Sequence, residues 1–327
     1  MRRWIWVAIV VVIGIAAIAM FEDAGELGDR LSGFSWWAFA GACGLALANY
    51  AIRFLRWQLY LRNQAVEIPT SSSALVFGSG LSLSITPGKV GELMKSYLLR
   101  ELHGVPVTKT APIVVAERVT DLIALLVIAV AGVAAYGIQP TLVAIASALV
   151  GFGLLILAWP RPARVIIDLS TRPKLTRRFR VSMHDIYGGL AGLCRPVLLV
   201  PATAIAVLAW LCECIGFALI VNAFPDAHVD LGLAMVIYAG TTIAGALSFL
   251  PGGLGVTEGA MTIALVQMAQ HVDRATAINA TLLTRIATLW LALVIGLGFL
   301  AAARARVARI ARVAALNGPP GSRAPTE

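Results

Sequence analysis

Long runs of apolar residues alternate with short polar segments along almost the whole chain. A membrane-spanning helix needs roughly 20 mostly apolar residues. The runs that meet this length predict six spanning helices, at 4–21, 35–55, 110–137, 139–159, 196–223 and 275–303. The first run follows Met1-Arg2-Arg3 and is interpreted as an uncleaved helix, with a cleaved signal peptide as the alternative.

Two further apolar stretches, 70–101 and 230–270, are interrupted in the middle by the motifs PGKVG and PGGLG. Proline removes a backbone donor and glycine tolerates a positive φ, so each motif predicts a break in a helix. The breaking residues are Pro87, Gly88 and Gly91 in the first motif and Pro251, Gly252, Gly253 and Gly255 in the second. Non-helical backbone at membrane depth must be shielded by protein or line a water-filled cavity. We therefore expect two re-entrant hairpins beside such a cavity.

Composition supports the membrane assignment and removes several other classes of function. Only 13% of the 327 residues are charged and 59% are hydrophobic, whereas a soluble domain carries about 25% charged residues. In so apolar a chain the net charge of +9 does not by itself indicate nucleic acid, and no nucleic-acid partner is expected. The four cysteines and four histidines show no metal-ligand spacing. Neither glycine motif has the spacing of a nucleotide-binding loop, so no cofactor is expected.

The basic residues predict the orientation, because short cytoplasmic loops are enriched in Lys and Arg. If both interrupted stretches are re-entrant, most of the 26 basic residues lie on one side. They fall in the N-terminus, in 53–62, in 95–109, in the loop 160–195 and in the tail 304–327. This predicts a protein of the bacterial cytoplasmic (inner) membrane with both termini in the cytoplasm.

The two interrupted stretches also match each other. Ser84, Pro87, Gly88, Gly91 and Glu92 correspond to Ser248, Pro251, Gly252, Gly255 and Glu258, and an arginine follows each motif, Arg118 and Arg285. Upstream, Asn49 corresponds to Glu213 at a single position. The chain is thus predicted to be a single membrane domain, 1–327, of repeat 1 (35–137), a connecting helix and basic loop (139–195), repeat 2 (196–303) and a basic tail (304–327). The orientation makes the two units an inverted repeat of helix, re-entrant hairpin and helix, an architecture typical of transporters.

Charged residues inside membrane segments are functional candidates, because each costs roughly 2.5–3.5 kcal/mol on insertion scales. The candidates for a substrate path are Lys89, Glu92, Glu117, Arg118, Asp121, Glu213, Glu258 and Arg285. Two interpretations are open: an ion-pair network that braces the hairpins, or a hydrophilic groove for a charged headgroup. Glu92 and Glu258 are either helix N-terminal caps or ligand contacts. Arg53 and Arg56 are interpreted as interfacial arginines whose side chains snorkel, with contact to lipid phosphate as the alternative.

The segments TPGKVGELMKSYLLR, AERVTDL and LPGGLGVTEGA together resemble the membrane domain of lysylphosphatidylglycerol synthase/flippase, the multiple peptide resistance factor, and its stand-alone flippase-like relatives. The resemblance covers residues 35–303. It implies an all-α bundle with two re-entrant hairpins that moves a lipid between leaflets. Bifunctional relatives carry an aminoacyltransferase domain after the membrane domain, and this chain ends at residue 327, so synthesis of aminoacylated lipid is not expected.

The expected function is therefore that of a lipid translocase, not an enzyme, acting on a polar-headgroup or isoprenoid- or polyprenyl-linked lipid. The alternatives are a membrane-embedded enzyme that uses Glu92, Glu117 or Asp121 as acid or base, and a non-catalytic scaffold of a lipid or glycolipid pathway. The expected partners are membrane lipids and, for a scaffold, lipid-biosynthesis enzymes. The oligomeric state and the lipid are left open.

Overall fold

The computed structural model describes residues 31–86, 91–136, 144, 148 and 180–316. Within this part of the chain every regular element is helical, apart from one isolated bridge between His228 and Gln270. The helices that are long and apolar enough to cross a membrane are Trp36–Asn63, Val107–Tyr136, Pro196–Val221 and Arg274–Ile310. The predicted all-α polytopic membrane fold is confirmed. The predicted spans 4–21 and 139–159 lie outside the described residues.

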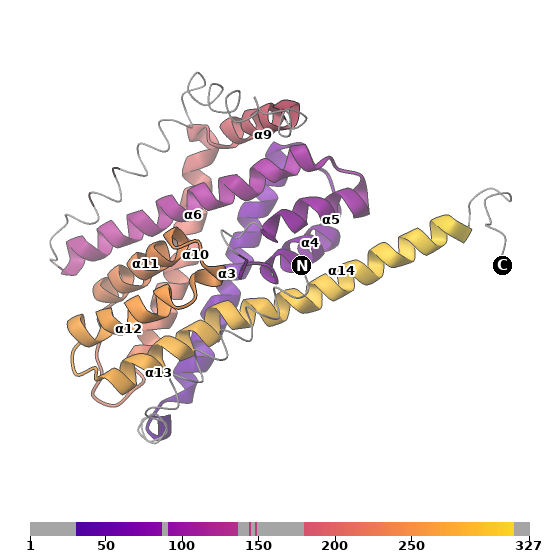
Figure 1. Cartoon of the computed structure of the whole chain (residues 1–327). Coiled ribbons are helices and arrows are strands. Elements are labelled where there is room, and N and C mark those ends of the chain that lie inside the picture. Colours follow the sequence, from indigo (N-terminus) through magenta and orange to yellow (C-terminus); the bar gives the residue numbers. More distant parts are fainter. Residues whose placement is uncertain (1–30, 87–90, 137–143, 145–147, 149–179, 317–327) are drawn as a thin grey trace.

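The first half of the molecule contains two short helices between two long ones (Figure 1). Its elements are α3 (Trp36–Asn63), α4 (Thr70–Leu81), α5 (Met94–His103) and α6 (Val107–Tyr136). At 1.5 Å per residue, the 12 residues of α4 span about 18 Å and cannot cross a hydrocarbon core of about 30 Å. The break lies between α4 and α5, where the sequence predicts it.

The second half repeats this order of elements after α9 (Arg180–Leu193). The elements are α10 (Pro196–Val221), α11 (Leu231–Leu247), the 3-10 turn Pro251–Gly253, α12 (Val256–Met268), α13 (Arg274–Arg285), the π-helical turn Ile286–Trp290 and α14 (Leu291–Leu316). α13, the π turn and α14 follow one another directly and form one long element. The matching order supports two related units, and their inverted relation stays a prediction.

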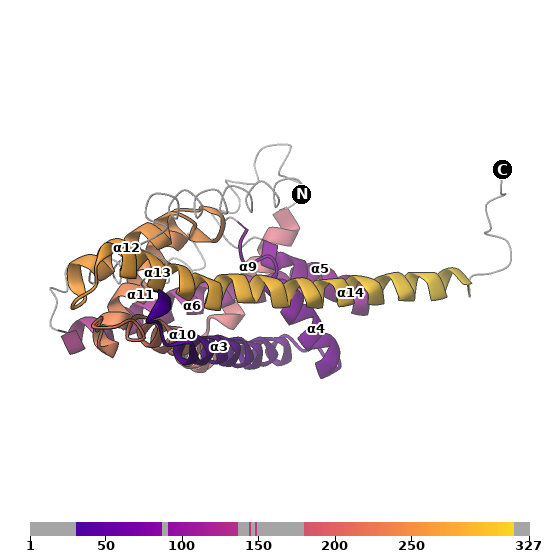
Figure 2. The same cartoon turned by 90° about the horizontal axis from the view of Figure 1, so that it is seen from below.

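The two halves interlock. α3 packs against α10 in the middle of the molecule, α4 of the first half packs against α14 of the second, and α11 of the second half packs against α6 of the first (Figures 1 and 2). Small residues permit the last two contacts. A Cβ on Gly296 would lie 2.1 Å from the backbone nitrogen of Ser82, and one on Gly132 would lie 2.7 Å from the carbonyl oxygen of Gly232. Each unit thus completes its core only with helices of the other.

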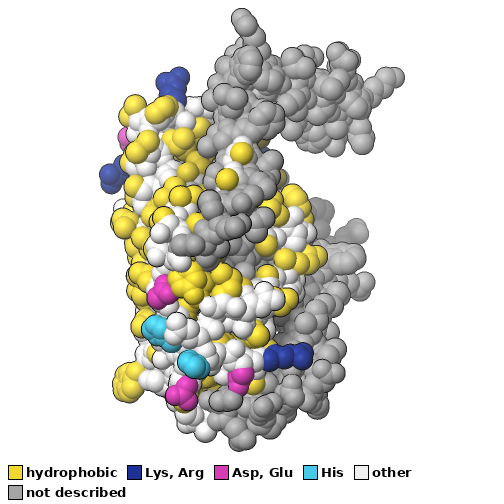
Figure 3. Space-filling view, turned by 90° about the vertical axis from the view of Figure 1, so that its left-hand side faces the viewer, with side chains coloured by type: hydrophobic (Ala, Val, Ile, Leu, Met, Phe, Trp, Pro, Cys, Tyr) yellow, Lys and Arg dark blue, Asp and Glu magenta, His cyan; other side chains and the backbone are white. Residues whose placement is uncertain are grey.

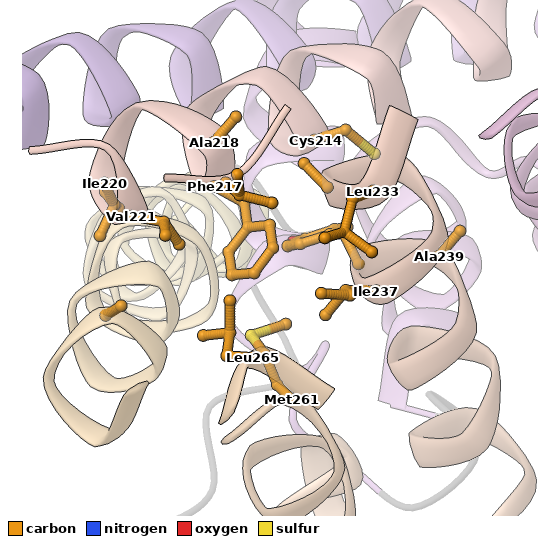
Figure 4. Close-up of a cluster of buried hydrophobic side chains, with 14 of the residues drawn as sticks. Cys214, Phe217, Ala218, Ile220, Val221, Leu233, Ile237, Ala239, Met261 and Leu265 are labelled. Atoms are coloured by element: carbon orange, nitrogen blue, oxygen red, sulfur yellow. The ribbon is translucent and has the colours of Figure 1, made fainter. Parts of the chain in front are cut away.

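The largest apolar core lies mainly in the second half, where Phe217, Ile237, Met261 and Leu265 converge from α10, α11 and α12 (Figure 4). A second cluster surrounds Trp57 in the first half. Hydrophobic side chains also cover much of the outer surface, and acidic and His side chains gather near one end of the face in Figure 3. This distribution suits a bundle whose flanks face lipid.

Candidate functional site

The second hairpin turns at PGGLG in a conformation that requires glycine. Gly252, Gly253 and Gly255 have φ of 63°, 67° and 84°, a region that residues with a Cβ rarely adopt. A Cβ on Gly253 would also lie 2.6 Å from the hydroxyl oxygen of Thr257. The predicted helix break is therefore confirmed here in atomic terms.

The first hairpin is described on both sides of its motif, whereas Pro87, Gly88 and Lys89 lie outside the described residues. The Gly91 N–H donates to the Thr86 hydroxyl oxygen at 2.8 Å, and a Cβ on Gly91 would lie 2.7 Å from that of Leu83. The corresponding serines behave alike. Ser84 donates to the Leu81 carbonyl at 2.8 Å, and Ser248 to the Gly245 carbonyl at 2.7 Å. Both short helices thus end in the same local hydrogen bond.

Each half contains an ion pair between its motif glutamate and its own arginine. Arg118 donates to Glu92 at 3.2 Å, and Arg285 donates to Glu258 at 2.6 Å. Arg285 also donates to the Gly252 carbonyl at 2.6 Å, which ties the long element to the hairpin turn. The sequence correspondence Glu92/Glu258 and Arg118/Arg285 therefore matches two equivalent contacts.

Glu258 additionally caps its own helix. Its carboxylate accepts the Gly255 N–H at 2.6 Å, so one of the free donors at the start of α12 is satisfied. Of the two roles considered for this residue, the cap is present, and it coexists with the ion pair.

The first half carries a larger charge network in its interior. Lys95 contacts Glu117 at 2.5 Å and Glu92 at 3.4 Å, and all three side chains are at most 5% exposed. The Lys95 ammonium also lies 4.8 Å from the centre of the Trp57 ring, a cation–π distance. The sequence assigned Lys95 to a basic cytoplasmic segment. That placement was wrong, because its carboxylate neighbours three residues before it and on α6 draw it into the bundle.

Asp121 is the second centre of this network. It is contacted by Arg56 at 2.8 Å, by Arg118 at 3.0 Å and by Arg53 at 3.8 Å, and it accepts the Trp210 indole N–H at 3.2 Å. The predicted pairing of Arg118 with Asp121 is confirmed. The interpretation of Arg53 and Arg56 as snorkelling arginines is corrected, since Arg56 is fully buried and Arg53 is 8% exposed.

Glu213 occupies the middle of α10 in the opposite half. Its carboxylate accepts the Tyr238 hydroxyl at 2.6 Å and is buried. Its sequence counterpart, Asn49, donates instead to the Ala209 carbonyl at 2.8 Å. The neighbouring Tyr50 donates to the Thr288 carbonyl in the π turn at 2.6 Å. Asn49 and Tyr50 of α3 thus both donate to the second half, whereas Glu213 is held within its own half.

A cavity of about 360 Å³ lies between these groups. Its wall combines the tips of both hairpins with charged side chains of both halves. The charged lining residues are Arg53, Arg118, Asp121, Glu213 and Arg285. Thr86 and Ser84 line it from the first hairpin, and Gly252 and Gly253 from the second. The cavity is lined largely by apolar side chains, with these charged groups set into its wall beside the broken helices, as expected where non-helical backbone is shielded by protein.

The family described as "Lysylphosphatidylglycerol synthase TM region" matches residues 5–296 of this sequence. The chain belongs to this family. A UPF0104 membrane protein of Methanothermobacter thermautotrophicus is 22% identical over 313 residues, which cover 87% of this chain and 91% of that protein. The resemblance seen in the motifs is confirmed, and the protein is a multi-pass membrane protein of this family.

The structure brings most of the predicted path residues together. Arg118, Asp121, Glu213 and Arg285 line one cavity, while Glu92 and Glu258 lie behind its wall as partners of the arginines. Glu117 is 1% exposed and faces Lys95 instead. Sequence reasoning missed Lys95, Tyr50, Trp210 and Tyr238. Only Lys95 had a usable signal, its position three residues after Glu92.

Proposed function

We propose that the protein is a lipid translocase whose substrate headgroup crosses the membrane through the cavity between the two hairpins. The observation that carries the proposal is the placement of Arg118 and Arg285 on the wall of one cavity, each tied to its own hairpin by a motif glutamate. A headgroup that binds both arginines would compete with the two glutamates and so change the contacts of both hairpins at once. Such coupling is what alternating access to a central site requires.

The charge network favours transport over a membrane-embedded acid–base reaction. Glu92, Glu117 and Asp121 are the carboxylates that an enzyme would use, and each lies within 2.5–3.2 Å of a cationic side chain. Carboxylates that each contact a buried or half-buried cation of the protein itself form an internal ion-pair network. The network therefore suits a structural brace beside the cavity better than a set of groups that react with a substrate.

The orientation completes the proposal. We place both termini in the cytoplasm of a bacterium and the protein in its inner membrane, since the described basic residues Arg304, Arg306, Arg309 and Arg312 lie on the exposed end of α14. The segment between α10 and α11, with Asp226 and Asp230, then faces outward.

Reconstitution into proteoliposomes tests the function directly. Lipids labelled with a fluorophore on the headgroup or on one chain are incorporated on both leaflets, and an impermeant quencher reports movement between leaflets. We expect scrambling with the natural protein and its loss in Arg118→Ala and Arg285→Ala. Arg309→Ala, an exposed arginine outside the cavity, should scramble normally.

Chromatography of the recovered lipids separates the other functions. A chemically changed lipid would identify an enzyme. If the lipid is neither moved nor changed, the scaffold is the function that remains. Either result with folded, correctly inserted protein overturns the translocase.

A further inference from the structure

Glu213 is the one charged residue of α10, an otherwise apolar helix. It lies eight residues before the end of that helix and is 7% exposed. Its side chain lines the cavity together with that of Tyr238. A carboxylate inside a membrane helix is costly, and carboxylates retained there commonly belong to ion paths or proton relays. Glu213 is therefore a candidate for a role in transport that the ion-pair network does not cover.

The contact between Glu213 and Tyr238 differs in kind from the contacts of the other carboxylates. The Tyr238 hydroxyl donates to Glu213 at 2.6 Å. The other carboxylates predicted for the path each contact an arginine or lysine; they are Glu92, Glu117, Asp121 and Glu258. A proton on one of those would weaken an ion pair. A hydroxyl group, by contrast, can donate to a carboxylate and accept from a carboxylic acid. The contact of Glu213 with Tyr238 thus suits both protonation states of the carboxyl group.

Titratable and charged groups surround Glu213 from the helices packed against α10. They are Tyr50 and Arg53 of α3, Arg118 and Asp121 of α6, Tyr238 of α11, Arg285 of α13, and Cys212 and Cys214 beside it on α10. The three arginines also contact other carboxylates, which are Asp121, Glu92 and Glu258. Protonation of Glu213 would therefore remove one negative charge from the cavity wall and leave these ion pairs in place.

Water in the cavity gives a proton access to Glu213. A cavity of about 360 Å³ has room for about a dozen water molecules, since each takes about 30 Å³ in the liquid. Besides the charged side chains, the hydroxyl-bearing Thr242, Thr257 and Thr288 line it, and polar groups of this kind hold buried water. Phe249 and Leu250 line the cavity and are exposed, so it reaches the surface at the tip of the second hairpin.

A proton on Glu213 would weaken the link between α10 and the second hairpin. Tyr238 lies on α11, the first arm of that hairpin, so its hydrogen bond to Glu213 joins the arm to α10. A hydrogen bond to an ionised carboxylate is about twice as strong as one between neutral groups. With Asn49 matched to Glu213, Tyr238 corresponds to Ala74, and neither residue of the first half titrates. This link is therefore specific to the second hairpin.

We infer that Glu213 is a proton-binding site that couples transport to the movement of protons across the membrane. The carboxylate takes a proton from water in the cavity, and its hydrogen bond with Tyr238 weakens. The proton returns to water when the cavity opens to the other side. This inference rests on the proposed function and adds the coupling ion to it.

Infrared difference spectroscopy of the reconstituted full-length protein tests the proton site without a lipid assay. A carboxylic acid has a C=O stretch that a carboxylate lacks, so the spectrum reports proton uptake between about pH 5 and about pH 8, where folded proteins are commonly most stable. We expect a carboxylic-acid band that disappears reversibly as the pH rises. The band should be missing in Glu213→Gln. It should shift in frequency in Tyr238→Phe, because the hydrogen bond is lost. Asp226→Asn, at an exposed carboxylate outside the cavity, is the control and should leave the band unchanged.

A pH gradient across proteoliposomes tests the coupling. A gradient of one pH unit is a tenfold ratio of proton activity, so one proton per lipid would support up to about a tenfold excess of labelled lipid in one leaflet. We expect such an excess with the natural protein and its collapse on addition of a protonophore. Glu213→Gln should distribute the lipid equally with or without the gradient. Arg309→Gln, on the exposed end of α14, should behave as the natural protein does.

Two results would overturn the inference: no carboxylic-acid band that depends on Glu213, or lipid movement by the natural protein that does not respond to the gradient. A band that titrates as expected, in a protein that moves no lipid, would remove the proposed function and keep the proton site. Glutamine keeps an acceptor for the Tyr238 hydroxyl, so Glu213→Gln is expected to fold. If it does not fold, Tyr238→Phe decides, and a band that keeps its frequency in that variant overturns the assignment to Glu213.

Discussion

The two halves of the molecule share one ion pair and differ in almost everything charged around it. With Asn49 matched to Glu213, Arg53 and Arg56 of the first half align with Phe217 and Ile220 of the second, and with Glu92 matched to Glu258, Lys95 aligns with Met261. The three cations belong to the buried charge network, whereas their counterparts are packed in the apolar core (Figure 4). The acids follow the same division. Glu117 and Asp121 align with Thr284 and Thr288, whose hydroxyls donate to carbonyls of their own helix.

This difference separates the contacts that fasten each hairpin from the additional charges found in the first half alone. The pair Glu92–Arg118 and the pair Glu258–Arg285 fasten each long helix to its hairpin, so they belong to the scaffold that both halves need. The additional charges of the first half depend on one another. Removing one partner leaves a buried ion unpaired and destabilises the fold strongly, whereas replacing the whole set with apolar residues costs far less stability. Four experiments test this division, from the largest expected effect to the smallest.

The proposed orientation, in which the second half enters and leaves the membrane on the cytoplasmic side, predicts opposite accessibility of two surface positions. Single cysteines replace His228, in the segment between α10 and α11, and Arg312, on α14, in a background without the four natural cysteines. An impermeant maleimide on intact cells should label position 228 and not position 312, an all-or-none difference. Labelling at 312 alone would reverse the orientation, and equal labelling at both would contradict this topology. Permeabilised cells, in which both should react, are the control.

Lys95→Met gives the first half the residue of the second. Glu117 would then be buried without its cation, and the free energy of unfolding should fall by about 3–5 kcal/mol. The measurement is unfolding by SDS titration in mixed micelles. The double substitution Lys95→Met with Glu117→Thr, which copies Met261 and Thr284, should recover most of this loss. If the double variant is as unstable as the single one, then packing or hydrogen bonding by Lys95 and Glu117, and not only their charge balance, stabilises the fold.

Removal of the charge from the motif glutamates should affect the two halves unequally. Glu92→Gln weakens contacts to both Lys95 and Arg118 at a site 5% exposed, and should cost about 2–3 kcal/mol. Glu258 is 22% exposed, and a glutamine there still accepts the Gly255 N–H. Glu258→Gln should therefore cost about 1 kcal/mol or less. Equal losses in the same SDS titration would contradict the asymmetry of the network.

Phe249→Gly tests the strained tip of the second hairpin. Glycine adopts the φ of 54° without penalty, and the lost side chain is mostly exposed. The free energy of unfolding, measured in the same SDS titration, should stay the same or rise by up to about 1 kcal/mol. Asp226→Gly, which has a φ of 64° far from the cavity lining, is the matched control for strain alone. A clear destabilisation by Phe249→Gly would show that this side chain stabilises the fold despite its exposure.

Much of the fold follows from local patterns. The spans Val107–Tyr136 and Pro196–Val221 fall within a few residues of the predicted runs, because a bilayer requires continuous apolar helices. The break at Pro251 and the positive φ of its glycines follow equally from local backbone chemistry. The pairing of Arg118 with Asp121 follows from their spacing on one helix.

The partners of the charges depend on contacts between distant segments. From its sequence alone, Lys95 reads as one more basic residue of a cytoplasmic segment, and Arg53 and Arg56 read as interfacial arginines. The structure buries all three, because α6 brings Glu117 and Asp121 against α3 and α5. A lysine or arginine at a helix end has two low-energy solutions, water or a buried carboxylate. Sequence spacing within one helix does not distinguish them.

The sequence by itself determined that this chain is a helical membrane protein with two broken helices and a recurring glutamate–arginine pair. Hydrocarbon imposes these features residue by residue, through apolar length and the need to shield free backbone groups. Only the tertiary structure decided that the arginines share one cavity, and that the tip of the second hairpin exposes Phe249 whereas the tip of the first buries Ile85. These properties arise where α3, α6, α10 and α11 meet. The shape of a cavity depends on how side chains from distant segments pack around it, which the sequence of no single helix determines.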